Sequence, residues 1–263
     1  MDTIPVELLT MIATDTFELF IKLLRVPMIG QRLCAEYPQL IARGRFIRTE
    51  SNHWRTKTYL NDRLHSFNDQ PTSVYAHGDK EWYWYGKPHR GDDLPAVVFA
   101  DGTKKWYWEG KQHRENDLPA VVYANDDKFW YWHGKLHREN DLPAVETASG
   151  NKYWYWEGKQ HRDNDQPAII YANGGKYWWW HGLVHRENDM PAIIYTSGDK
   201  YWYWNGKLHR GNDLPAVTYA NGDKSWYQYG KRHRENDQPA IECTDGNKEW
   251  YVDGKRVGTL SII

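Results

Sequence analysis

The segment at residues 198–221 reads GDKYWYWNGKLHRGNDLPAVTYAN, and most of this pattern recurs along the chain every 24 residues. A fixed period of roughly 20–50 residues is typical of proteins that grow by stacking small units, each in contact with its neighbours. The first tryptophan of the pattern marks the period, at Trp82, Trp106, Trp130, Trp154, Trp178, Trp202, Trp226 and Trp250. The spacing predicts a repeat array over residues 51–263, with about eight units and an atypical first and last unit.

One repeat has the signals of two short strands joined by tight turns. Residues 200–204 are rich in aromatic side chains, and Asn205-Gly206 follows them. This dipeptide is a strong hairpin signal because both of its residues can adopt positive φ. We expect a return strand at 207–210, an interruption at 211–213, a further strand at 215–219, and a turn into the next repeat at Asn221-Gly222.

The alternation of side chains along a strand separates the residues of one repeat into two faces. Trp202 and Trp204 are expected on a dry face, and Tyr203 with Asn205 on the other face. The tryptophans of the 24-residue grid are therefore predicted to be structural. The position after the second tryptophan differs from copy to copy and is the predicted site of partner binding, at Tyr85, Glu109, His133, Glu157, His181, Asn205 and Tyr229.

These features predict a mainly β protein. Two strands per repeat advance a sheet by about 10 Å, so eight repeats would span on the order of 80 Å. We therefore expect an elongated, single-layer antiparallel β-meander. An aspartate that recurs two residues before a proline, as Asp213 does before Pro215, is predicted to accept backbone N–H groups in an Asx-type turn.

Residues 1–50 have a different pattern and form the second predicted domain. Apolar residues cluster from Val6 to Ile12 and from Phe17 to Leu24, and Pro5 suits the first turn of a helix. The pattern predicts a small α-helical cap ahead of the repeats.

A histidine recurs in each repeat, as at His185 and His209, and Arg follows it in most copies. Equivalent side chains in neighbouring repeats would lie about 10 Å apart, which is too far for two ligands of one metal ion. We expect these His and Arg side chains to brace the loops by bonding to Asp or Glu of their own or the next repeat. Neither a nucleophile motif nor a phosphate-binding glycine loop is present, so we expect no enzyme activity, no cofactor and no metal.

The chain carries 34 Lys plus Arg and 35 Asp plus Glu, so its charge does not favour nucleic acid as a partner. Its two cysteines do not form a disulfide framework, and it has neither a signal-peptide pattern nor a long apolar run. An intracellular location is the expectation.

The motif Tyr-x-x-x-x-Gly-Lys-x-His, with a glycine turn before the next aromatic strand, resembles the MORN repeat over about residues 52–256. That family builds hairpins into an elongated antiparallel sheet, and some of its members bind membrane lipid. The repeat differs from the family pattern in its length of 24 residues and in having His-Arg-Glu-Asn-Asp-x-Pro-Ala where the family has His-Gly-x-Gly.

The N-terminal Ile4-Pro5-Val6-Glu7-Leu8-Leu9-x-x-Ile12 resembles the start of an F-box, although the end of that motif is missing. The resemblance implies docking on a Skp-type adaptor of ubiquitin ligases through Leu8, Leu9, Ile12 and Val26. Both parts together resemble the F-box and MORN-repeat proteins of marseillevirus-type giant viruses. That resemblance implies the cytoplasm or nucleus of an infected host cell, or the virion, as the location.

Three functional hypotheses follow from these patterns. The first is a non-enzymatic scaffold for protein–protein interaction, the second an F-box-type substrate receptor, and the third a membrane-lipid binder, which the neutral charge supports only weakly. A homodimer through the C-terminal repeat is a further hypothesis, because an unpaired sheet edge can bind a second chain and Leu260, Ile262 and Ile263 are apolar.

Overall fold

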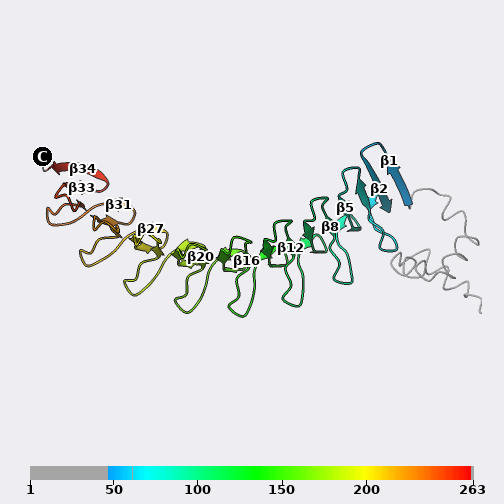
Figure 1. Ribbon diagram of the computed structural model, residues 1–263, viewed down its shortest axis with the longest axis horizontal. Coiled ribbons are helices and arrows are strands. Elements are labelled where there is room, and N and C mark those ends of the chain that lie inside the picture. The colour runs from blue at the N-terminus through cyan, green and yellow to red at the C-terminus, as the bar shows by residue number, and fades with distance from the viewer. Residues whose placement is uncertain (1–46, 61, 262–263) are drawn as a thin grey trace, which may run out of the picture. The chain divides into compact units, whose positions relative to one another are not determined.

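The computed structural model describes residues 47–60 and 62–261, which form strands and turns and no helix (Figure 1). The chain divides at Ala100/Asp101 into two compact units, and each unit is described by itself. Residues 1–46 of the predicted helical cap lie outside the described part. Residues 47–50 of that cap are wrongly predicted, because they belong to strand β1 (Ile47–Ser51), which pairs with residues 56–60 in an antiparallel hairpin.

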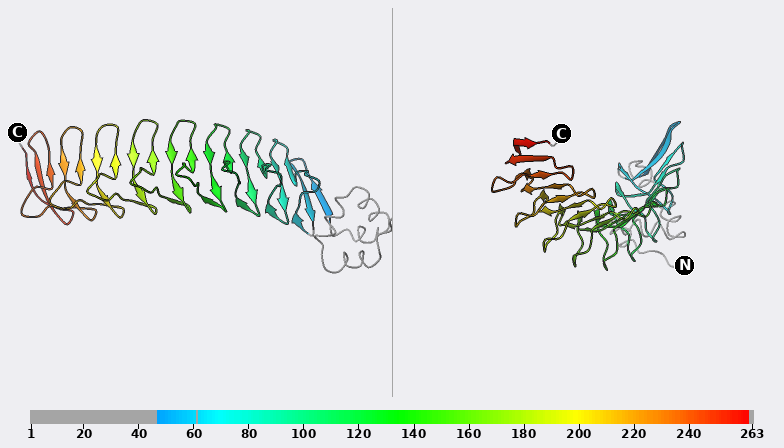
Figure 2. Two further views of the ribbon diagram at one scale, coloured as in Figure 1. Left: turned by 90° about the horizontal axis from the view of Figure 1, so that it is seen from below. Right: turned by 60° about the vertical axis from the view of Figure 1, so that its left-hand side comes forward.

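The unit that begins at Asp101 is built on one antiparallel ladder, and Figure 2 shows its short strands side by side in chain order. Each strand pairs with the one before and the one after it in this ladder, which confirms a mainly β fold of repeated hairpins. The ladder strands are β9 (Lys104–Lys105), β12 (Val121–Val122), β13 (Lys128–Phe129), β16 (Val145–Glu146), β17 (Lys152–Tyr153), β20 (Ile169–Ile170), β21 (Lys176–Tyr177), β24 (Ile193–Ile194), β25 (Lys200–Tyr201), β28 (Val217–Thr218), β29 (Lys224–Ser225), β32 (Ile241–Glu242), β33 (Lys248–Val252) and β34 (Lys255–Leu260).

The repeats from Trp106 to Trp226 also have a small hairpin that is separate from the ladder, so the predicted count of two strands per repeat was too low. The hairpins are β10 (Tyr107–Trp108) with β11 (Lys111–Gln112), β14 (Tyr131–Trp132) with β15 (Lys135–Leu136), β18 (Tyr155–Trp156) with β19 (Lys159–Gln160), β22 (Trp179–Trp180) with β23 (Leu183–Val184), β26 (Tyr203–Trp204) with β27 (Lys207–Leu208), and β30 (Tyr227–Gln228) with β31 (Lys231–Arg232).

The grid tryptophan is the point at which the chain changes its pairing partner. In the repeat 198–221 the backbone N–H of Trp202 donates to the carbonyl of Ala216, and its own carbonyl accepts from the N–H of His209. Residues before Trp202 therefore pair with the distant strand β28, and residues after it pair with the nearby strand β27. The aromatic segment is continuous in sequence but belongs to two ladders.

Three tight turns close each repeat, and the two predicted ones are confirmed. Asn205 and Gly206 have φ of 46° and 78°, the left-handed values that a two-residue hairpin turn requires. Gly222, with a φ of 94°, closes the turn into the next repeat by donating its N–H to Tyr219. The third turn lies in the loop, where Asn212 and Asp213 both have positive φ and Leu214 donates to the carbonyl of Gly211.

The core of this unit consists mainly of one tryptophan and one alanine from each repeat. The grid tryptophans from Trp106 to Trp226 are 5–8% exposed, and the alanine that follows each proline is fully buried. A β-branched residue of the ladder, such as Val217 or Ile193, is buried beside each alanine up to Ala216, and Ile241 beside Ala240 is half-buried. The alanines are Ala120, Ala144, Ala168, Ala192, Ala216 and Ala240.

The unit that ends at Ala100 repeats the same plan with a modified first copy. Its strand at residues 55–60 runs unbroken through Thr58, which stands where later copies have the grid tryptophan. Leu60 at the end of this strand and His65 after it are both buried. Its strands are β1, β2 (Arg55–Leu60), β3 (Arg63–Leu64), β4 (Ser73–Tyr75), β5 (Lys80–Glu81), β6 (Tyr83–Trp84), β7 (Lys87–Pro88) and β8 (Val97–Val98).

Left-handed φ at the repeat turns predicts a clear difference between two glycines. Gly198 has a φ of 97°, and a Cβ there would meet only Ala220 Cβ at an ordinary 3.5 Å, whereas Gly211 lies outside the left-handed region and has open space. We expect Gly198→Ala to lower the free energy of unfolding by about 1 kcal/mol or more, because alanine resists this φ. Gly211→Ala is the matched control and should be neutral or stabilising in urea unfolding. Equal losses in both variants would contradict the assignment of the cost to φ.

Candidate interaction surface

The residues predicted to bind a partner all lie at the tips of the small hairpins. Those of the unit from Asp101 have φ of 46–50° and exposed side chains: Glu109, His133, Glu157, His181, Asn205 and Tyr229. Tyr85, in the other unit, has the same backbone conformation and is half-buried. Left-handed φ is uncommon for Glu, His and Tyr and costs about 1–2 kcal/mol per residue, so the repeat contacts must hold these tips in place.

A histidine of the preceding repeat holds most of the tips by a hydrogen bond, and at Tyr229 the ring of His209 stacks on the tip side chain at 4.2 Å instead. The backbone N–H of Asn205 donates to Nδ1 of His185 at 3.2 Å, and the tip at Glu157 has the same bond to His137 at 3.3 Å. Some tip side chains add their own contacts. The ring of His133 stacks on that of His113 at 4.6 Å, and Glu157 pairs with Nζ of Lys135 at 2.7 Å.

The second tryptophan is exposed in the repeats from Trp108 to Trp204, so the expectation that Trp202 and Trp204 share a dry face is wrong. Trp204 is 45% exposed and Trp202 only 8%. The alternation was counted along one continuous strand, whereas the pairing changes at Trp202. The exposed members of this row, which we call the outer tryptophans, are Trp108, Trp132, Trp156, Trp180 and Trp204, at 45–51% exposure.

The outer tryptophans are held in place by the same row of histidines. The centroid of Trp132 lies 4.5 Å from that of His113, and that of Trp204 lies 4.6 Å from His185, both in edge-to-face geometry. Trp156 and Trp180 make the same contact with the preceding repeat, at 4.4 and 4.5 Å. Each of these four indoles is thus fixed on one side and open to solvent on the other.

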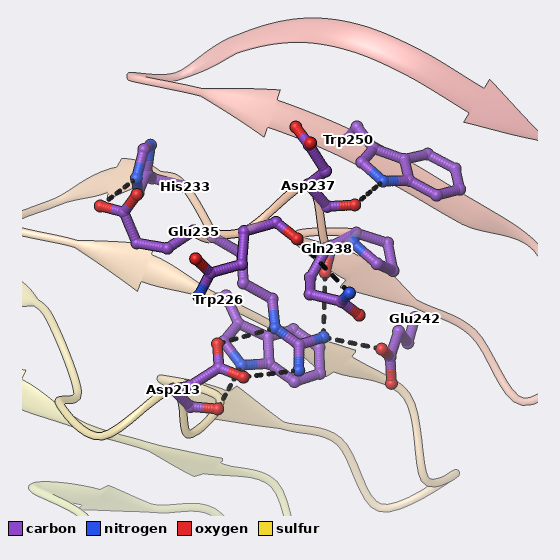
Figure 3. A network of polar contacts seen from close by, with 11 residues as sticks. Asp213, Trp226, His233, Glu235, Asp237, Gln238, Glu242 and Trp250 are labelled. Atoms are coloured by element: carbon purple, nitrogen blue, oxygen red, sulfur yellow. Dashed lines mark hydrogen bonds and ion pairs between the residues drawn. The ribbon is translucent and has the colours of Figure 1, made fainter.

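An aspartate, an arginine and the grid tryptophan form a clamp between successive repeats, and Figure 3 shows the one around Asp213 and Trp226. The guanidinium of Arg234 donates to both carboxylate oxygens of Asp213, at 2.9 Å each, and lies 3.9 Å from the centroid of Trp226. The indole N–H of Trp226 donates to the backbone carbonyl of Asp213 at 3.0 Å. The Arg234 guanidinium also donates to the carbonyl of Pro239 and to Glu242 in its own repeat.

The same clamp recurs through the described repeats. Its members are Asp69, Arg90 and Trp82 in the first unit, and in the second unit Asp117, Arg138 and Trp130; Asp141, Arg162 and Trp154; Asp165, Arg186 and Trp178; Asp189, Arg210 and Trp202; Asp213, Arg234 and Trp226. The hydrogen bond from the arginine holds the pKa of each of these carboxyl groups below its ordinary value of 3.8.

The clamp contradicts one prediction about the loop and agrees in part with another. The Asx-type turn is wrong, because the aspartate carboxylate binds an arginine 21 residues later rather than a backbone N–H of its own loop. The bracing role of His and Arg is confirmed for partners in the same repeat, because Nε2 of His161 lies 3.1 Å from Asp163 and Arg138 donates to Glu146. The main partner of the arginine was wrongly expected in its own or the next repeat, because its aspartate belongs to the preceding one.

Leu8, Leu9, Ile12 and Val26, predicted to dock an adaptor, lie outside the described residues. Within residues 47–60 and 62–261, no group of three or more His, Cys, Asp or Glu side chains is arranged to hold a metal ion. No helix of the described part has the length and apolar character needed to cross a membrane.

No protein-family model matches the chain, and no curated protein matches it.

Reasoning from the sequence missed the outer tryptophans as a surface feature, although a signal was present. Gln228 and Val252 replace this tryptophan in the last two copies, whereas the grid tryptophan is retained in both. A position that is occupied by Trp in some copies and by Gln in another, next to a two-residue turn, is typical of an exposed hairpin arm.

The clamp geometry predicts that lysine cannot replace its arginine. Arg210 is largely buried, binds Asp189 through two 2.7 Å hydrogen bonds and stacks on Trp202. We expect Arg210→Lys to lower the free energy of unfolding by about 1–2 kcal/mol, because an ammonium group cannot make the paired bonds or stack as well. Arg256→Lys, at an exposed position of β34, is the control. A double-mutant cycle with Asp189→Asn should show coupling, and additive effects would argue against the clamp.

The buried position of His113 predicts that stability falls in mild acid. Burial lowers the pKa of His113 below its ordinary 6.5, the neighbouring His133 lowers it further, and Glu115 opposes them. The folded state therefore binds this proton more weakly than the unfolded state, and stability is lost as pH falls below about 6.5. A second loss follows below 3.8, as the clamp aspartates take up protons. Urea midpoints across this pH range test both steps, and His113→Gln should reduce only the upper one.

Proposed function

We propose that the chain is a non-enzymatic repeat scaffold that binds a protein partner along the hairpin arms, through the outer tryptophans and the tip residues beside them. The observation that carries this proposal is the row of indoles that are about half exposed yet fixed in place by the histidines of the preceding repeats. Large rigid aromatic side chains give much contact area with little loss of side-chain freedom, and tryptophan is enriched among residues that dominate binding energy.

The tip residues supply the second part of the proposed surface. They lie directly after the outer tryptophans and change from Glu109 to His133, Glu157, His181 and Asn205 along the unit. A surface with a constant aromatic row and a variable polar row combines affinity from the first with selectivity from the second. The proposed location inside an infected host cell rests on the resemblance to giant-virus proteins alone.

A membrane-lipid binder is the alternative that a specific observation favours. Exposed lysines recur once per repeat on one face of the ladder, at Lys104, Lys128, Lys152, Lys176, Lys200 and Lys224. Two glutamates on that face, Glu146 and Glu242, are bonded to clamp arginines. Such a row would attract an anionic surface, although the near-neutral chain as a whole gives little long-range attraction.

Two further hypotheses remain predictions. The F-box-type receptor depends on a segment outside the described residues. The homodimer would use strand β34, which pairs with β33 and leaves Val257 and Leu260 well exposed.

Replacing three outer tryptophans tests the scaffold proposal. Trp132, Trp156 and Trp180 would be changed to Ala together, and immobilised protein would be compared with the unchanged chain for capture of host proteins by quantitative mass spectrometry. We expect the specifically captured protein to be lost, since removing one interface anchor alone costs about 2 kcal/mol or more.

The matched control changes Leu118, Leu142 and Leu214 to Ala, because these side chains are also apolar and 38% exposed but lie on the loops. Thermal unfolding of both variants separates lost binding from lost folding. Capture that survives the tryptophan changes, or disappears equally in the leucine control, would contradict the proposal. Sedimentation with phosphatidylserine vesicles, lost when the ladder lysines become Gln, would favour the lipid alternative.

A further inference from the structure

A hydrogen bond recurs on the turns that connect one repeat to the next. A side-chain oxygen just before the ladder lysine accepts the backbone N–H of a residue 21 positions later, in the following turn. Asp199 accepts in this way from Ala220 at 2.7 Å, and Asp127 from Ala148 at 2.7 Å. Carboxylate, amide and hydroxyl oxygens all serve, since Asn151 and Thr103 make the same bond to Ala172 and Ala124 at 2.8 and 3.1 Å.

Gly175 breaks this series. It occupies the acceptor position but has no side chain, and the N–H of Thr196, which corresponds to that of Ala220, has no acceptor within residues 47–60 and 62–261. A pocket of about 180 Å³ opens at this place. Its lining consists of Tyr171, Asn173, Gly175, Tyr177, Tyr195 and Thr196.

The next junction of the same chain provides an internal comparison. Asp199 has tyrosines at the three equivalent positions around it, Tyr195, Tyr201 and Tyr219, and its carboxylate occupies the place that is open beside Gly175. The backbone at Gly175 is outside the left-handed region, and a Cβ there would meet Asn173 Oδ1 at 3.3 Å and Tyr171 at 3.5 Å. A side chain is therefore compatible with this position, and its absence leaves the Thr196 N–H without the acceptor that Asp199 provides at the next junction.

The walls of the pocket are aromatic and its polar groups are uncharged. Tyr177 packs edge-to-face on Tyr171 at 5.1 Å and on Tyr195 at 5.6 Å. The amide oxygen of Asn173 accepts the N–H of Gly175, and Thr196 adds a hydroxyl beside its open N–H. An ion would lose hydration here without a counter-charge among the lining residues, which is costly, so the lining favours a neutral ligand that carries oxygen acceptors.

We propose that this pocket binds a neutral pyranose ring of a sugar. The apolar C–H face of the ring would pack on the tyrosines, and a ring hydroxyl would accept the Thr196 N–H, as the Asp199 carboxylate accepts the Ala220 N–H at the next junction. The size suits a single ring, and the rim of amide and hydroxyl groups suits the remaining hydroxyls. This binding site is separate from the hairpin arms and does not depend on the scaffold function.

Backbone amide NMR of the full chain tests the proposal, with methyl glucoside, galactoside, mannoside and N-acetylglucosaminide as probes. We expect at least one pyranoside to give saturable shifts centred on the amides of Thr196 and Gly175. In Gly175→Asp the shifts should be lost while the thermal midpoint stays equal or rises, because the new carboxylate restores the recurring hydrogen bond. In Asp199→Gly a second set of saturable shifts should appear at the amide of Ala220.

Three results would overturn the proposal. One is the absence of saturable shifts at Thr196 with every pyranoside. Another is the persistence of the same shifts in Gly175→Asp, because the sugar would then bind elsewhere. The third is a saturable response of Thr196 to sodium acetate but to no pyranoside, which would identify an anion site. If Gly175→Asp fails to fold, the appearance or absence of the new shifts in Asp199→Gly decides the question.

Discussion

The clamp between successive repeats is the interaction on which the rest of the array depends. Its aspartate lies in a loop that has two consecutive residues at positive φ and contributes no strand of its own. The next repeat holds that loop from two sides, through the paired bonds of an arginine such as Arg210 and the indole N–H of Trp202. The arginine also stacks on the tryptophan. The carboxylate and the face of the indole ring together compensate the cost of removing the guanidinium charge from water. The loop of one repeat is therefore stabilised by side chains of the next repeat, and each repeat depends on its neighbour for an ordered loop.

This dependence explains why the exposed surface of the arms can be rigid without a conventional two-layer core. The grid tryptophan is buried together with the fully buried alanine, and the clamp arginine stacks on it. The histidine before a clamp arginine, such as His185 before Arg186, then fixes the next hairpin tip and the next outer tryptophan. Residues that stabilise the repeat and residues that form its exposed surface thus lie within a few positions of one another in the sequence. A change in the clamp would disturb the arms indirectly, whereas a change at a tip leaves the clamp intact.

Local signals in the sequence were enough to predict the turns and the mainly β class, and non-local ones were missed. Asn205-Gly206 and Asn221-Gly222 encode positive φ within two residues, so their turns could be predicted. The exposure of Trp204 could not be obtained from alternation, because the pairing partner changes at Trp202 and nothing local marks that change. Asp189 was assigned to an Asx turn since its partner, Arg210, lies 21 residues away. The repeat period itself held that information, because each aspartate and the arginine 21 positions later recur together.

The repeats of this chain vary least at the positions where a substitution would cost the most stability. Asp, Arg and Trp of the clamp are the same in each repeat from Asp117 to Arg234. Loss of one member would leave a partly buried charge or a loop carbonyl without its hydrogen-bond partner. The acceptor before the ladder lysine varies among Asp, Asn, Thr and Gly, since its absence costs one bond at a solvent-accessible turn, about 0.5–1.5 kcal/mol. An array whose stability is a sum over junctions tolerates such a loss at one of them. Positions of low structural weight are therefore where a repeat protein can acquire an individual site, and Gly175 and the hairpin tips are positions of that kind.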